Sequence, residues 1–146
     1  MSFLRRYVLV FVEFFSRRKT TDRTQLPTAR FLTTSRHYAA THVREAAFLP
    51  AEDNLLSVFF VNGLAPEDVK DLGVTHVVLE QGRRLHGYAR ILLQAFEKRG
   101  LHVMADEPPP RHANVGGWPD EKSARKLIAQ QLAADATLNL FASPEV

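Results

Sequence analysis

The chain has 146 residues, of which 45% are hydrophobic and 24% charged, and its formal net charge at pH 7 is +3. This composition is typical of a folded globular domain and excludes an intrinsically disordered chain. The absence of cysteine excludes a disulfide scaffold and a cysteine-ligated zinc or iron–sulfur site.

Residues 1–26 predict a basic amphipathic N-terminal segment followed by a linker. Apolar side chains recur at helical spacing over residues 3–15, although part of this run also suits a strand. Arg5 and Arg6 before an apolar run resemble the start of a signal peptide. Glu13 interrupts that run and no small-residue cleavage site follows, so we expect no cleaved signal.

This N-terminal helix has three interpretations. It packs on its own domain, it lies in a membrane surface, or it docks on a protein partner or a second copy of the chain. No apolar run in the sequence approaches the roughly 18 residues of a membrane span. With no cysteine and no span, we expect a cytoplasmic protein.

Residues 27–146 predict a single α+β or α/β domain with one small mixed sheet of four to five strands and three to four helices. Residues 56–61 are almost continuously apolar, which indicates a strand covered on both faces. The other expected strands cover residues 30–34, 75–79, 101–104 and 112–115, with a brief extended piece at 47–49. The expected helices cover residues 65–73, 84–99 and 119–138, and residues 35–45 form a short helix or an irregular loop.

Positive charge is concentrated in residues 1–46, which hold nine basic and three acidic side chains, and eight of the nine are arginine. Arginine binds phosphate and carboxylate groups in a bidentate manner, so this third of the chain favours an anionic partner, above all nucleic acid. An ordinary solvated basic surface is the alternative. The residues expected to make the contact here are Arg5, Arg6, Arg17, Arg18, Lys19 and Arg36.

Six histidines are the first candidates for chemistry, but no pair has the HExxH spacing of a zinc protease helix. We therefore expect no metal and no cofactor. His76 and His102 fall in expected strands, where we interpret them as hydrogen-bonded partners in or beside the core. Phe59 and its neighbour Phe60 are interpreted as core rather than as platforms for base stacking.

Residues 33–38 and 111–119 are the two segments that gather polar side chains. The first joins Arg36 and His37 with hydroxyl groups after an expected strand, and is either a ligand loop or a hydroxyl-rich helix cap. The second is either a tight turn before a helix or a ligand or partner contact. Its candidate binding residues are Arg111, Asn114 and Trp118.

His37 and His112 each follow an arginine, which suggests a catalytic hypothesis. If the two pairs face one cleft, two imidazoles would act as acid and base while guanidinium groups stabilise a phosphate. The leading hypothesis is an accessory protein that binds nucleic acid or another anionic macromolecule. The alternatives are a histidine-dependent phosphodiesterase or nuclease, and a protein-interaction subunit or homo-oligomer that docks through the N-terminal helix.

Overall fold

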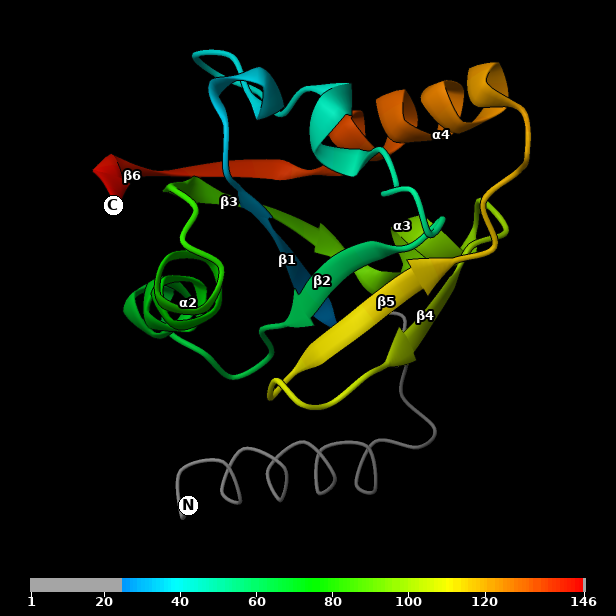
Figure 1. The fold of residues 1–146 in the computed structure, drawn as a ribbon. Helices are drawn as coiled ribbons and strands as arrows, with labels where there is room; N and C mark the ends of the chain where they lie inside the picture. The colour runs from blue at the N-terminus through cyan, green and yellow to red at the C-terminus, as the bar shows by residue number, and fades with distance from the viewer. Residues whose placement is uncertain (1–24, 146) are drawn as a thin grey trace.

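The computed structural model describes residues 25–145, which fold around one antiparallel sheet of six strands (Figure 1). The expected N-terminal helix and the candidate residues Arg5, Arg6, Arg17, Arg18 and Lys19 lie outside the described residues. The strand order is β4-β5-β2-β1-β3-β6. The strands are β1 (Pro27–Leu32), β2 (Leu56–Phe60), β3 (Leu85–Leu92), β4 (His102–Ala105), β5 (His112–Gly116) and β6 (Thr137–Glu145).

Three α-helices and three shorter helical segments accompany the sheet in residues 25–145. The α-helices are α2 (Pro66–Gly73), α3 (Leu93–Glu97) and α4 (Lys122–Asp135). The shorter segments are the 3-10 turns η2 (Ser35–His37) and η3 (Glu45–Phe48) and the π-helix η4 (Val74–Glu80), which continues α2. None of the helices described is long and apolar enough to cross a membrane.

The two faces of the sheet are covered by different helices, and β2 contributes to both. Phe60 belongs to a core cluster with Leu132 of α4, whereas Phe59 belongs to a second cluster with Val69 of α2 and Val77 of η4. Figure 1 shows α2 and α4 on different sides of the strands. Successive side chains of a strand point to opposite faces of the sheet, so a continuously apolar strand is buried on both faces. The expectation that β2 is covered on both faces is confirmed.

The expected mixed sheet of four to five strands is wrong, because the sheet has six strands and every pairing is antiparallel. The expected helix over residues 84–99 is instead β3 followed by α3. A register shift between Leu85 and Gly87 puts Leu85 and Tyr88 in the same core cluster, which imitates helical spacing. Gly87 also lets the backbone of Asn139 approach closely, so pairing with β6 overrides the helical pattern.

Three other local expectations are wrong. Residues 75–79 belong to the π-helix η4, because Gly73 has helical backbone angles and the chain continues directly from α2 into η4. A Cβ on this glycine would lie 2.7 Å from the Phe31 ring, so its small size serves packing against β1. The helix expected to reach residue 138 ends at Asp135, and the chain then turns into β6. The expected extended piece at 47–49 overlaps the 3-10 turn η3.

Candidate active site

A pocket of about 330 Å³ opens beside β2 and β5 on the face of the sheet that α2 and η4 partly cover. We name it the strand pocket. Its volume lies at the lower end of the range for small-molecule sites. The polar side chains that line it are Arg30, Thr33, Ser57, His76, Glu80, Gln81, Arg83, Asp106 and His112.

Ser57 and His112 meet in this pocket by diagonal pairing across two strands. In the β2–β5 ladder Ser57 stands opposite Asn114, and Phe59 stands opposite His112. Diagonal neighbours on one face of a sheet are close enough for side chains to touch. The Ser57 Oγ atom lies 2.9 Å from Nε2 of His112, and the hydroxyl remains exposed to the pocket.

Asp106 fixes which nitrogen of His112 carries the proton. The main-chain carbonyl of Asp106 lies 3.0 Å from Nδ1, and a carbonyl only accepts, so Nδ1 is the donor. In the neutral ring Nε2 is then the acceptor, and the hydroxyl of Ser57 donates its proton to it. The Asp106 carboxylate lies 3.6 Å from Nδ1 and accepts a hydrogen bond from Asn114 at 2.8 Å. This arrangement suits a nucleophile, a general base and a carboxylate that stabilises the imidazolium.

His76 brings a second imidazole to the pocket from η4. Its Nδ1 lies 2.6 Å from a carboxylate oxygen of Glu80, one helical turn later. Its ring stacks on Phe59 at a centroid distance of 5.2 Å, and His112 contacts the same ring at 5.2 Å. The buried phenyl ring of Phe59 therefore holds both imidazoles in fixed positions at one pocket.

Arg30 enters the pocket where β1 and β2 separate. The ladder between these strands ends at the pair Ala29 and Phe59. Beyond this pair, the guanidinium of Arg30 donates to main-chain carbonyls that have no strand partner there. Its Nη1 donates to the carbonyl of Ser57 at 3.1 Å, and its Nε donates to the carbonyl of Ala47 at 2.7 Å. Arginine has five N–H donors, so about three of them have no protein partner among residues 25–145.

Arg30, Arg83 and His37 form a positively biased cluster at the pocket. Burial, and then the charge of Arg83, lower the pKa of Arg30 to about 10, which leaves it charged at neutral pH. Burial, and then the charges of Arg30, Arg83 and His86, lower the pKa of His37 to about 4. Nδ1 of His37 accepts the amide proton of Thr33 at 3.1 Å, so the neutral ring carries its proton on Nε2. His37 is therefore a neutral donor rather than a third cation.

Of the two predicted arginine–histidine pairs, the strand pocket contains only His112. His37 lies electrostatically close to Arg30 and Arg83 but is not among the residues lining the pocket. Arg36 is exposed and lines a different hollow. Asn114, predicted to bind a ligand, acts beside the site by orienting the Asp106 carboxylate.

Arg111 and Trp118, also predicted to contact a ligand or partner, use their polar groups inside the fold. Arg111 is buried and its Nη1 donates to the carbonyls of Phe60 and Asn62, at 3.3 and 3.0 Å. Trp118 is buried and its indole N–H donates to the carbonyl of Val115 at 3.0 Å. These contacts tie β5 to the end of β2 and to the segment before α4.

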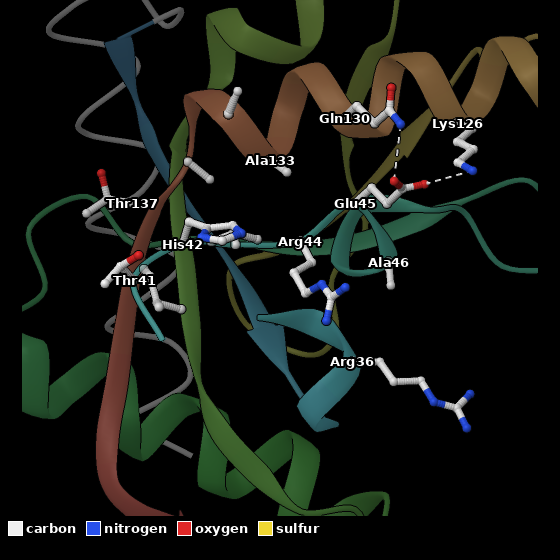
Figure 2. A pocket seen from close by; sticks show the side chains of 14 residues that line it. Arg36, Thr41, His42, Arg44, Glu45, Ala46, Lys126, Gln130, Ala133 and Thr137 are labelled. Atoms are coloured by element: carbon white, nitrogen blue, oxygen red, sulfur yellow. Dashed lines mark hydrogen bonds and ion pairs between the residues drawn. The ribbon is translucent and has the colours of Figure 1, made fainter. Parts of the chain in front are cut away.

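A wider hollow of about 870 Å³ lies along η3, α4 and the beginning of β6 (Figure 2). We name it the helix groove. Arg36 and Arg44, labelled in Figure 2, are exposed, and neither guanidinium has a hydrogen bond or ion pair within the described part of the chain. Glu45 accepts from Gln130 at 3.2 Å and pairs with Lys126 at 3.9 Å. This hollow is larger than the strand pocket but holds fewer polar groups in fixed positions.

In comparisons with known proteins, no family model, curated protein or solved structure matches this chain significantly. Among the residues described, no group of three or more histidine, aspartate or glutamate side chains could hold a metal ion.

Sequence reasoning missed seven polar residues of the strand pocket: Arg30, Ser57, His76, Glu80, Gln81, Arg83 and Asp106. One signal was present, because Ser57 is the single polar residue in the apolar run 56–61. On a strand covered on both faces, a lone hydroxyl marks a place where the cover is incomplete. The others carry no such signal, since nothing local pairs Ser57 with a histidine 55 residues later.

Proposed function

We propose that the chain is an ester hydrolase in which Ser57 is the nucleophile and His112 is the general base. The observation that carries this proposal is the 2.9 Å contact between the Ser57 hydroxyl and Nε2 of His112. The Asp106 carbonyl holds the opposite ring nitrogen in the donor state, which leaves Nε2 free to accept the serine proton. The proposal differs from the alternative hypothesis of a histidine-dependent phosphodiesterase or nuclease, because Ser57 rather than His37 is the partner of His112 and the bond cleaved is an ester of any class.

The reaction divides into two displacements at the same serine. In the first, Oγ of Ser57 attacks the electrophilic centre of the ester, its proton moves to Nε2 of His112, and the bond to the leaving oxygen breaks while a second acid gives that oxygen a proton. In the second, a water molecule gives a proton to that second group and attacks the serine ester, and Ser57 leaves with the proton that His112 returns. The Asp106 carboxylate stabilises the imidazolium that exists between the two proton transfers.

Covalent labelling tests this proposal without knowledge of the natural substrate. A fluorophosphonate probe forms a bond between its phosphorus and an activated serine oxygen and releases fluoride. We expect the full-length chain to take up one probe, with the modified peptide containing Ser57. Ser57→Ala abolishes the labelling.

Ser123→Ala is the matched control, because Ser123 is an exposed serine that also contacts a carboxylate, Glu121, at 3.3 Å. We expect this variant to keep full labelling, because the probe reacts with the serine that His112 activates and not with any exposed serine. An unlabelled wild-type chain, or equal labelling of both serines, would contradict the proposal.

A second candidate function is contact with nucleic acid through the helix groove. The favouring observation is that Arg36 and Arg44 line this open hollow with guanidinium groups that have no partner within residues 25–145. Such groups suit phosphate oxygens. Measured binding to an oligonucleotide that weakens steeply with salt would support it, and salt-insensitive binding would count against it.

A further inference from the structure

The charges of the strand pocket point to the class of substrate. This inference rests on the proposed hydrolase function. Both carboxylates of the pocket are already engaged, Asp106 by Asn114 at 2.8 Å and Glu80 by His76 at 2.6 Å. Neither carboxylate forms an ion pair with Arg30 or Arg83 within the described residues.

The two arginines of the pocket have no such partner. Arg30 donates only to main-chain carbonyls, and the side chain of Arg83 makes no hydrogen bond or ion pair with any residue from 25 to 145. The two charges also oppose each other, since Arg83 contributes to lowering the pKa of Arg30. Two like charges held near each other are stabilised by an anion that binds both.

We infer that the ester hydrolysed in the strand pocket is a phosphate ester, with its non-bridging oxygens bound by Arg30 and Arg83. Arg30 is placed for this role because its Nη1 bonds the carbonyl of Ser57, so its remaining donors lie beside the nucleophile. Guanidinium groups match phosphate oxygens in shape and stabilise the charge that grows during phosphoryl transfer. The nearby His37 is neutral and does not compete for the phosphate as a cation would.

The step balances with the residues present. Oγ of Ser57 forms a bond to phosphorus, its proton moves to His112, and the bond from phosphorus to the ester oxygen breaks. In-line displacement puts the leaving oxygen opposite the nucleophile, so a group other than His112 supplies its proton. His76 is the second imidazole of the pocket: when its ring is protonated, Nδ1 donates to Glu80 and Nε2 gives its proton to the leaving oxygen. A water molecule then gives one proton to His76 and attacks phosphorus, and the Ser57 oxygen leaves with the proton that His112 holds.

Inorganic phosphate titrated into the full-length chain is the direct test of the arginine pair. We expect Arg83→Ala to weaken phosphate binding about tenfold, as removal of one charge-assisted hydrogen bond does. Arg84→Ala is the matched control, because this exposed neighbour does not line the pocket, and it leaves binding unchanged. Failure of the wild-type chain to bind phosphate, or equal weakening in the two arginine variants, overturns the inference.

A pair of chromogenic esters completes the test. Arg83→Ala should lower kcat/KM for p-nitrophenyl phosphate about tenfold, and by clearly more than it lowers that for p-nitrophenyl acetate. An equal decrease for both esters overturns the phosphate assignment. Labelled Ser57 without phosphate binding overturns the substrate class alone, whereas phosphate binding without labelling overturns the hydrolase function and leaves an anion site.

Discussion

The strand pocket and the helix groove differ in volume, in charge and in how firmly their side chains are held. The smaller strand pocket is the better candidate for a catalytic site. The groove has more than twice the volume of the pocket, yet Arg36 and Arg44 on its rim have no partner within residues 25–145. In the pocket, Ser57 and His112 are held by strands and by named hydrogen bonds. Catalysis depends on groups fixed in position before the substrate arrives, whereas a salt-dependent contact with a polymer needs only charge.

The same difference appears in how each region is supported. Behind the pocket lies Phe59, 6% exposed, which contacts both imidazoles and belongs to the core on the α2 face. Along the groove, the support comes from the exposed contacts of Glu45 with Gln130 and Lys126. A packed aromatic ring keeps its neighbours at a fixed distance, while an exposed ion pair contributes little. Variants in the two regions should therefore differ in the size of their effects.

The largest effect is expected from His112→Asn, which removes the general base. Turnover of a p-nitrophenyl ester should fall by about 10²- to 10⁴-fold, the usual contribution of a positioned acid–base group. Steady-state kinetics of the purified chain measure it. His102→Asn is the control, since His102 is an exposed residue of the edge strand β4. Retained turnover in His112→Asn would make the Ser57 contact a purely structural one.

The next effect is a dependence of stability on pH that comes from His37. Its pKa is about 4 in the folded chain against an ordinary value near 6.5. The unfolded chain therefore binds the proton more readily in this window, and the free energy of unfolding falls as the pH drops from about 6.5 toward 4. The decrease is at most about 3 kcal/mol.

His37→Gln removes this titration and keeps a side-chain oxygen that can accept the Thr33 amide proton. Chemical denaturation at several pH values should show a flatter profile for the variant between pH 4 and 6.5. Part of the slope remains, because burial and Arg84 also lower the pKa of His86. Identical profiles for the wild-type chain and the variant would show that the cation cluster does not act on His37.

A smaller effect is expected from the groove. Replacing Arg36 and Arg44 by alanine should weaken oligonucleotide binding uniformly across sequences and reduce the salt slope by about 2, one for each phosphate that the variant no longer neutralises. Fluorescence anisotropy over a range of salt concentrations measures both quantities. Labelling of Ser57 should not change in this double variant. An unchanged salt slope would remove the helix groove from consideration as a nucleic-acid contact.

The smallest effect is expected at the groove floor. Glu45→Gln removes the charge that Lys126 meets at 3.9 Å, but leaves a side-chain oxygen that can accept from Gln130. The Lys126 side chain is 60% exposed, so the free energy of unfolding should change by less than about 1 kcal/mol. A larger decrease would show that the groove is as firmly built as the strand pocket.

Local sequence signals were sufficient for some elements and misleading for others. The strand expected over residues 56–61 and the helix expected over residues 65–73 agree with β2 and α2, because the apolar run of the strand and the Pro66 start of the helix act within the element itself. The helix expected over residues 84–99 is wrong at β3. Leu85 and Tyr88 lie three residues apart, as on one face of a helix, and the register shift lets both enter the same core cluster from a strand. Pairing with β1 and β6 decides that segment, and neither partner is adjacent in sequence.

In the candidate site, too, the sequence indicates single residues but not the distant residues that they contact. His112 was singled out by the chemistry of its side chain, and its role as a possible base remains a prediction. Its expected partner was His37, whereas the contact in the structure is with Ser57, 55 residues away. Arg30 was counted only as one charge of a basic segment, yet it bonds two carbonyls where β1 and β2 separate. Spacing along the chain does not report such contacts.

The sequence by itself determined a domain that mixes helices and strands, the doubly covered strand β2 and the absence of cysteine, because composition and short periodic patterns decide these properties. Only the tertiary structure decided the six-stranded antiparallel order and the meeting of Ser57, His112 and Arg30 at one pocket. The physical reason is that strand pairing joins segments far apart in the chain. A side chain gains its partners, its hydrogen-bonding state and its chemistry from that pairing.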